Sequence, residues 1–237
     1  MKIKAIILLF ILSFTVLLTS AFAQRTPEKI VDKVKANFLK IKDAKGDLIL
    51  DYNLCLFGCA GTRRLSGEAY YMAPDKLWGT NQHGNSYYAR GNRILKVTKD
   101  GKKYNIKLLN APNLAPGFHP GIIPYNFNLT LIKDDAEEIV IEGIPKPGIL
   151  KNITKVTFYI DPKEYLLRKL HLTLINNRLS GDVFIKYKKI KGIWVPYETY
   201  GKSAIELSNH ALIGLGFKLK TKNIKINTGF SGKSFKL

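Results

Sequence analysis

Segments of strand length follow one another along most of this chain, and the turns between them are too short to hold a helix. Between residues 47 and 108, alternating or apolar segments are bounded by Gly, Asn or Asp, and the Asp-Gly pair at residues 100–101 is typical of a hairpin. Similar segments continue to residue 226, including separate strands expected over 193–200 and 203–208. Many strands joined by short turns predict one antiparallel sheet, strongly curved or barrel-like, in a mainly β protein with some helix (α+β).

The first 23 residues have the pattern of a secretory signal peptide. A basic start precedes an apolar run over residues 5–18, and residues 21–23 give the small-x-small sequence at which signal peptidase cleaves. We expect cleavage before Gln24, so that residues 24–237 form one exported domain. The alternative is an uncleaved anchor, since the apolar stretch is just long enough to span a bilayer.

An amphipathic helix is expected directly after the signal peptide. Thr26 suits the N-cap, Pro27 the first turn, and Glu28 the positive end of the helix dipole. Apolar residues at helical spacing form one stripe, and the helix is expected to end near residues 43–46. Such a stripe must lie on an apolar surface.

The segment from Asn110 to Lys133 differs from the rest because it is rich in both Pro and large apolar residues. Four prolines lie between residues 112 and 124, with Phe, Ile, Leu and Tyr residues among them. A turn-rich segment this apolar does not suit a solvated linker. It is expected either to cover an apolar surface as a lid, with a short helix near 121–131, or to be a crossover packed in the core.

The sequence contains no recognisable reactive or metal-binding motif. The His residues lack a Cys, Glu or second His at metal-ligand spacing, and there is neither a nucleophile elbow nor a phosphate-binding Gly-rich loop. His171 falls in an expected strand, where a sheet-surface residue is favoured over a general base. The acidic cluster over 134–138 lacks the spacing of a calcium loop, so a solvated loop is favoured. The sequence therefore predicts no catalytic residue, no metal site and no cofactor.

Cys55 and Cys59 are the only cysteines of the chain. Gly58 suits the left-handed position of a three-residue hairpin loop, which would place the two Cys on opposite strands. An oxidising compartment would let them form a disulfide. A structural clasp is favoured over a redox-active pair, because redox pairs are spaced as Cys-x-x-Cys.

The chain is strongly basic, with 38 Lys and Arg against 18 Asp and Glu and a net charge of +20. Export argues against nucleic acid as the partner. Peripheral contact with an anionic membrane surface, or with another acidic partner, fits better. The alternative is that lysines scattered over exposed strands serve solubility and protect sheet edges.

Four segments together resemble a known family. Residues 67–77, Gly-Glu-Ala-Tyr-Tyr-Met-Ala-Pro-Asp-Lys-Leu, are similar to a strand pair formed around a Pro. Residues 89–96 are similar to an Asp-Gly hairpin, residues 187–196 to a late strand pair, and residues 224–227 followed by Phe235 to a chain ending. In this order, after an amphipathic helix, they resemble LolA, the periplasmic lipoprotein carrier, and the wider LolA-like lipoprotein-sorting proteins.

The resemblance implies an unclosed β-barrel whose mouth is plugged by helices and whose cavity shelters the acyl chains of lipoproteins or similar amphiphiles. It also implies a periplasmic location, an inner-membrane transporter and an outer-membrane acceptor as partners, and sorting to the outer membrane. In the carrier an Arg precedes the strand-ending Pro, whereas here Ala73 precedes Pro74. That difference keeps an alternative open, a non-enzymatic envelope sensor that recognises a protein partner or an anionic glycolipid. A monomer is expected in either case.

Strand alternation, the position of Leu77 in the family pattern and the Pro-rich lid together define the expected ligand cavity. The expected cavity residues are Leu48, Leu50, Tyr52, Ala69, Tyr71, Leu77, Phe118, Ile122 and Phe127. Plain core packing is the alternative for all of them, because a filled core and a cavity differ only in how completely side chains fill the space.

Overall fold

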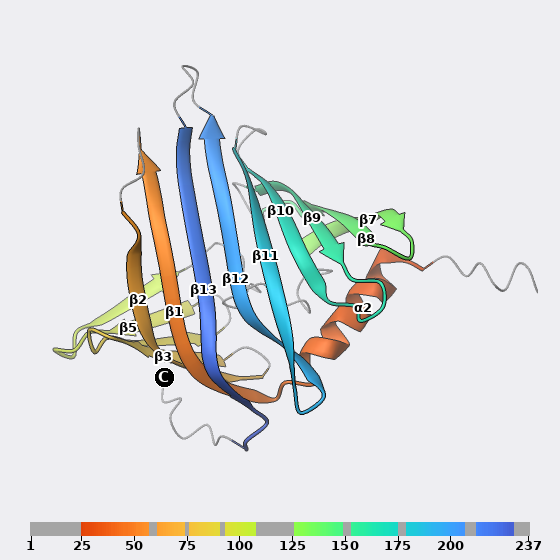
Figure 1. Ribbon diagram of the computed structural model, residues 1–237. Helices are drawn as coiled ribbons and strands as arrows, with labels where there is room; N and C mark the ends of the chain where they lie inside the picture. The colour runs from red at the N-terminus through yellow and green to blue at the C-terminus, as the bar shows by residue number, and fades with distance from the viewer. Residues whose placement is uncertain are drawn as a thin grey trace, which may run out of the picture.

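The computed structural model describes residues 25–56, 61–73, 76–90, 93–107, 126–148, 153–174, 179–206 and 212–229. These residues form one helix and one large antiparallel sheet (Figure 1). The elements are α2 (Pro27–Phe38), β1 (Asp43–Leu56), β2 (Arg63–Met72), β3 (Lys76–Asn81), β4 (Ser86–Arg90), β5 (Arg93–Val97), β6 (Lys103–Lys107), β7 (Phe127–Asp134), β8 (Ile139–Pro145), β9 (Ile153–Ile160), β10 (Leu167–Leu174), β11 (Leu179–Ile190), β12 (Ile193–Glu206) and β13 (Leu212–Ile226). No helix within these ranges is long and apolar enough to cross a membrane.

The sheet has 13 strands in the order β6-β5-β4-β3-β2-β1-β13-β12-β11-β10-β9-β8-β7. The first and last strands of the chain therefore pair at its centre, and each half is a simple meander running outward from them. Short turns join most neighbours, as in the hairpin at residues 98–102, where Gly101 has a φ of +84°. The predicted curved antiparallel sheet, mainly β and unclosed, is confirmed.

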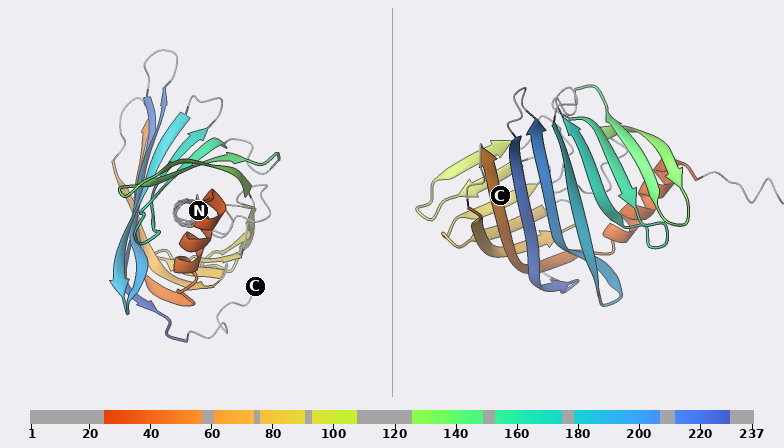
Figure 2. Two further views of the ribbon diagram at one scale, coloured as in Figure 1. Left: turned by 90° about the vertical axis from the view of Figure 1, so that its right-hand side faces the viewer. Right: turned by 45° about the horizontal axis from the view of Figure 1, so that its top comes forward.

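The sheet curls so strongly that it surrounds α2 on several sides (Figure 2). Glycines on the inner side of the curve permit the close approach of neighbouring strands. At Gly67 of β2, for example, a Cβ would overlap the carbonyl oxygen of Thr80 in β3. A larger residue there would force the two strands apart.

The helix α2 is built from local signals and buries one apolar stripe. Thr26 is its N-cap, and the Thr26 Oγ1 accepts a hydrogen bond from the Lys29 amide at 3.4 Å. Ile30, Val31 and Val34 are buried against the inner face of β7–β10. The main core therefore lies between α2 and this half of the sheet.

A second, smaller core lies where the start of β1 meets the end of β13. Ile41, Val195 and Ile226 are buried together, next to the N-terminal end of β1. The buried Asp43 carboxylate accepts hydrogen bonds from the Thr228 amide at 2.8 Å and the Gly229 amide at 3.1 Å. These contacts hold the start of β1 to the residues that follow β13.

Two sequence expectations, the end of the helix and the division of residues 193–206, are wrong in detail. The helix ends at Phe38, not near residues 43–46, because Asp43 and its neighbours pair with β2 and β13. Residues 193–206 form one strand, not two, since Gly201 is not a turn residue. A Cβ at Gly201 would lie 2.6 Å from the ring of Phe217, so this glycine makes room for a packed aromatic side chain.

The Pro-rich segment is corrected at its C-terminal end. Strand β7 begins at Phe127 and pairs with β8, so the helix expected near 121–131 does not extend into it. Residues 108–125, which carry the four prolines together with Phe118 and Ile122, lie outside the described residues. The lid therefore stays a prediction for residues 112–124.

Replacing a side chain in the main core should be costly. Phe158 is 0% exposed and makes an edge-to-face contact with Phe127 at 5.8 Å between ring centroids. We expect Phe158→Ala to lower the free energy of unfolding by about 3–5 kcal/mol, because it leaves a cavity. Urea denaturation followed by circular dichroism measures this. Ile132→Ala is the control: its side chain is 58% exposed, so a comparable loss there would contradict the assignment of the core.

Candidate functional site

The inner, concave face of the sheet gathers six of the expected cavity residues, although their role as a ligand site stays a prediction. These are Leu48, Leu50, Tyr52, Ala69, Tyr71 and Leu77. Ala69 lies opposite Gly46, two residues before Leu48 on β1, and Tyr71 lies opposite Leu77. Opposite residues of an antiparallel pair share a face, so all six project to one side. Tyr71 contacts the ring of Phe38 at the end of α2, at 5.8 Å between centroids, which identifies this side as the one facing the helix.

The concave face has two halves that differ in how well they are covered. Under α2 the central side chains from β7–β10 are fully buried, among them Ile139, Ile141 and Phe158, and only those at the margin of this core are partly buried. Across β1–β3 and the part of β13 that pairs with residues 48–52, the inward apolar side chains keep intermediate exposure. This second group, called here the open half, comprises Leu48, Leu50, Tyr52, Leu65, Ala69, Tyr71, Leu77, Phe217 and Leu219.

The open half is continuous across the central strand pair. Phe217 of β13 lies opposite Tyr52, and Leu219 opposite Leu50. The outward residues of the same strands are charged or polar: Asp47, Asp51, Arg64, Glu68, Lys218 and Lys220. Alternation along each strand thus separates an apolar inner face from a charged outer face.

The other expected site residues are placed differently. Phe127 was expected in the lid, but it lies in β7 and is buried in the main core beneath α2. Phe118 and Ile122 lie outside the described residues. Cys55 pairs through its backbone with Gly214, and Cys59 is not described, so their disulfide stays a prediction.

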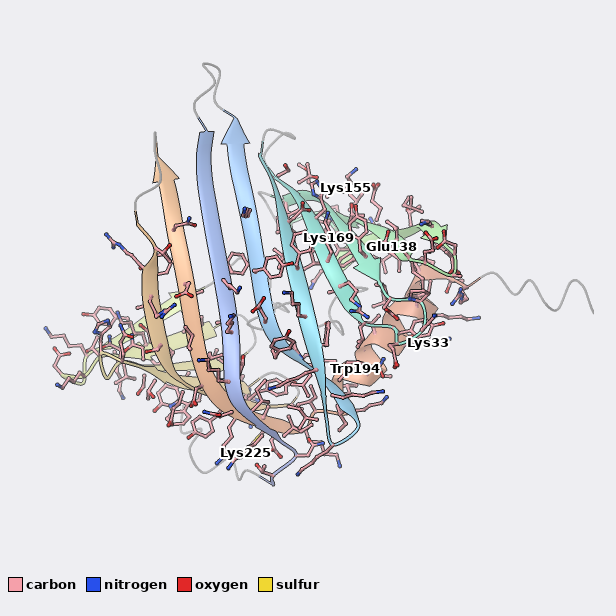
Figure 3. All side chains as sticks on the ribbon, viewed as in Figure 1. Lys33, Glu138, Lys155, Lys169, Trp194 and Lys225 are labelled. Atoms are coloured by element: carbon pink, nitrogen blue, oxygen red, sulfur yellow. The ribbon has the colours of Figure 1, made fainter. Side chains whose placement is uncertain are left out.

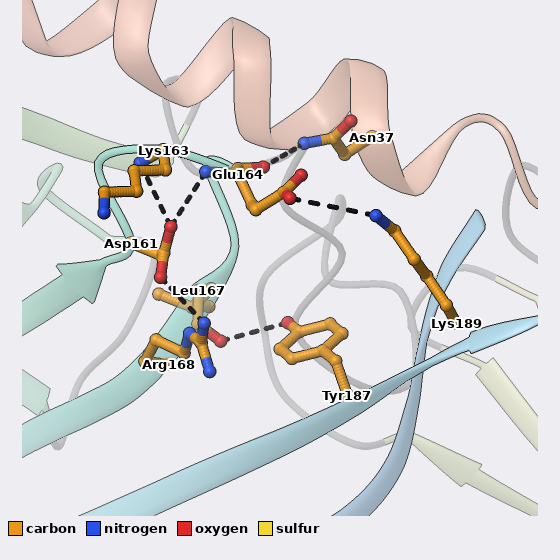
Figure 4. Close-up of polar contacts among 8 residues, drawn as sticks. All are labelled: Asn37, Asp161, Lys163, Glu164, Leu167, Arg168, Tyr187 and Lys189. Carbon is orange, nitrogen blue, oxygen red and sulfur yellow. Dashed lines mark hydrogen bonds and ion pairs between the residues drawn. The ribbon is translucent and has the colours of Figure 1, made fainter. Parts of the chain in front are cut away.

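One end of α2 is fixed to the sheet through the turn between β9 and β10 (Figure 4). The Asn37 Nδ2 donates a hydrogen bond to the Glu164 carbonyl oxygen at 2.5 Å. Asp161 shapes this turn, since its Oδ1 accepts from the amides of Lys163 at 3.0 Å and Glu164 at 2.8 Å. Burial alone would raise the pKa of Asp161, but the Glu164 amide and the Arg168 guanidinium outweigh it and lower that pKa.

The beginning of α2 has polar contacts as well. Arg25 forms an ion pair with Asp134 at 2.5 Å, and both Arg25 and Lys33 donate to the Tyr165 hydroxyl, at 2.8 and 3.1 Å. The hydrogen bond from Lys33, together with Arg25, lowers the pKa of Tyr165. The helix is therefore held against the sheet by a few exposed or part-buried polar contacts in addition to its apolar stripe.

The titratable groups considered at the sequence level have structural partners. The His171 Nδ1 lies 2.9 Å from the Asp182 Oδ1, on the outer face, where Asp182 also pairs with Lys169 at 3.1 Å. Asp135 shapes the hairpin between β7 and β8 by accepting from the Glu137 and Glu138 amides, each at 2.9 Å. Within the described ranges, no three His, Cys, Asp or Glu side chains come together as a metal site would require.

A sheet that curls around its own helix and presents an apolar inner face defines a class of fold, the LolA-like unclosed barrel. No protein-family model matches the sequence, and no curated protein matches it either. Solved structures do share the fold, and they include proteins named for this class.

A DUF1329 family protein from Desulfovibrio piger aligns with a TM-score of 0.65 at 12% identity, over 88% of this chain and 96% of the other. A putative outer membrane lipoprotein-sorting protein domain from Vibrio parahaemolyticus aligns with a TM-score of 0.61 at 12% identity, over 87% and 95%. A LolA superfamily protein from Nitrosomonas europaea aligns with a TM-score of 0.59 at 11% identity, over 90% and 98%. The predicted LolA-like fold is thereby confirmed.

The turn that anchors α2 should make stability depend on pH. Because the folded pKa of Asp161 lies below its ordinary value of 3.8, its charge stabilises the fold above that pH and less as pH falls through the folded pKa. Asp161→Asn keeps an oxygen that can accept from the two amides but loses the pair with Arg168. We expect a loss of about 0.5–1 kcal/mol near neutral pH that disappears in acid. Urea denaturation of both proteins from neutral to acidic pH measures this, and an equal loss at every pH would contradict it.

Proposed function

We propose that this protein is an exported, periplasmic carrier that shelters the acyl chains of lipoproteins or similar amphiphiles on the concave face of its sheet. The observation that supports this most is the open half, a continuous apolar surface that remains partly exposed inside the curve. Apolar side chains at the centre of a finished core are fully buried, as Ile139, Ile141 and Phe158 are under α2. A surface that is inward-facing, apolar and incompletely covered suits an apolar ligand.

The proposed activity needs no catalytic group. Each CH₂ of an acyl chain that leaves water contributes about 0.8 kcal/mol, so a chain laid along the open half would gain affinity from burial alone. Residues 112–124 are proposed to close over the bound chain as a lid. Release then requires that this lid opens, which Pro and Gly breaks in the segment favour.

The solved structure from Vibrio parahaemolyticus is named for outer membrane lipoprotein sorting, and the shared fold supports the same role in the proposal made here. In that role the carrier, proposed to be a monomer cleaved before Gln24, would receive its ligand from an inner-membrane transporter and deliver it to an outer-membrane acceptor. The alternative is the envelope sensor, which Ala73 favours because the carrier has an Arg there.

Native mass spectrometry of the protein purified from its own envelope separates these two functions. A carrier is expected to copurify with lipid or acylated protein in stoichiometric amount, which organic extraction would identify. A clean ligand-free mass, together with no uptake of a fluorescent fatty-acid probe, would contradict the carrier and favour the sensor.

Two neighbouring residues of β1 provide a matched test of the ligand surface. Leu50 projects into the open half, whereas Ile49 projects outward, opposite Lys220. We expect Leu50→Gln to weaken binding of the fatty-acid probe by tenfold or more, since a buried Leu contributes about 1.5–3 kcal/mol. Ile49→Gln is the control and should leave probe binding unchanged in a fluorescence titration. Equal affinities for the two variants would show that the probe does not bind the concave face.

A further inference from the structure

A groove lies on the outer face of the sheet, across the central strands β1, β13, β12 and β11. It has a volume of about 310 Å³. Gly216 lies in it, opposite Asn53 on one side and Lys202 on the other, and a Cβ at this position would collide with the Asn53 side chain. The absence of a side chain at residue 216 therefore keeps the groove open.

The groove is bordered by lysines that share one carboxylate. Glu198 is only 6% exposed, and its oxygens lie 3.1 Å from the Lys186 Nζ, 3.6 Å from the Lys218 Nζ and 3.5 Å from the Lys220 Nζ. Burial would raise the pKa of Glu198, but these three lysines outweigh it and lower that pKa. Glu198 thus holds three ammonium groups in place but neutralises only one charge.

The neighbouring acidic groups do not balance the remaining charge. Asp51 is engaged by a bidentate contact with Arg64, at 2.6 and 3.1 Å. Asp182, opposite Lys202, is engaged by Lys169 and His171. Lys202 itself lines the groove and is exposed. Around the groove, in the described part of the chain, cations therefore outnumber carboxylates.

Aromatic rings extend this basic surface across the sheet. The rings of Phe184 and Tyr200 stack at 5.1 Å, with Lys186 over Tyr200 at 5.2 Å and Lys169 over Phe184 at 5.3 Å. Figure 3 shows Lys169 and Lys155 among the side chains of this same outer side. Lysines that lie beside aromatic rings suit the headgroup level of a bilayer, where aromatic side chains are also favoured.

We propose that the groove and its surrounding lysines bind the phosphate headgroups of anionic phospholipids, so that the outer face of the central strands docks on a membrane surface. Anionic lipid surfaces attract clustered lysines. The excess of positive charge around the groove, and the lysines that lie over aromatic rings, therefore support a phospholipid headgroup as the ligand. Protein partners are instead held mainly by a few large side chains buried in pockets. Tyr52 and Phe217 of the open half also border the groove, but its lysines lie on the opposite face of the sheet. Docking through these lysines therefore does not depend on the proposed carrier function.

The test is co-sedimentation of the purified protein with vesicles of phosphatidylcholine that do or do not contain phosphatidylglycerol. The wild type should bind only the anionic vesicles, and binding should fall as salt rises. The variant Lys202→Gln/Lys218→Gln/Lys220→Gln keeps Lys186 on Glu198, so the buried carboxylate retains its nearest partner. Each lysine removed should weaken binding by about fivefold, or about 100-fold for the three at low salt.

The matched control removes the same charge elsewhere, from exposed lysines outside the groove: Lys29→Gln/Lys99→Gln/Lys163→Gln. If both triple variants bind anionic vesicles equally weakly, net charge and not the groove causes the binding, and the proposed site is wrong. If calorimetry shows that the protein binds inorganic phosphate but does not bind anionic vesicles, the ligand is a soluble anion, which also contradicts the proposal. If the groove variant does not fold, the wild type is labelled at its lysine amines with and without anionic vesicles. The vesicles should protect Lys218 and Lys220 from labelling but leave Lys29 accessible. Equal protection of all three lysines would contradict the proposal.

Discussion

The pairing of β1 with β13 is the contact on which the rest of the structure depends. It runs from Ala44 opposite Ile226 to Leu56 opposite Ile213, and it joins the two meanders that the chain lays down before and after residues 108–125. Without it the sheet would divide into two meanders, of which only the half that contains β7–β10 is covered by α2. Asp43 reinforces the pair by binding the amides that follow β13. Strands β1 and β13 lie near opposite ends of the described chain, so their pairing joins residues that are far apart in the sequence. This central pair therefore cannot form until β13 has been synthesised.

Because the sheet is curved, it has a concave inner face that is apolar and a convex outer face that is charged. Because side chains alternate along a strand, β1 presents Leu48 and Leu50 inward and Asp47 and Asp51 outward within five residues. The helix α2 fills one half of the concavity and leaves the other half partly covered. The same alternation that stabilises the fold therefore also supplies an apolar surface on the inside and a basic surface on the outside.

The sequence was sufficient for the class of fold but not for its register. Alternation within one strand correctly placed Leu48 and Leu50 on one face, and the Asp-Gly turn correctly predicted a hairpin. Which strands become neighbours depends on long-range pairing, so nothing local indicated that Glu198 would meet Lys220 from β13. Separate strands were expected over 193–200 and 203–208, whereas Gly201 lies within one strand and makes room for the ring of Phe217. Strand β7 was missed because nearby prolines obscured the alternation of Phe127, Leu129 and Leu131, the signal that could have revealed it.

The contrast between the two halves of the concave face is the strongest argument about function that the fold permits. Under α2, Phe158 and Ile141 are sealed at essentially no exposure, which shows that this sequence can build a dry core. The open half is equally apolar, yet Leu48, Leu50 and Leu219 keep contact with solvent. Leaving such side chains partly hydrated costs free energy that further packing could recover. An apolar ligand that binds this surface would recover that free energy. A carrier needs such a surface, and it needs the surface to remain accessible so that the ligand can also be released.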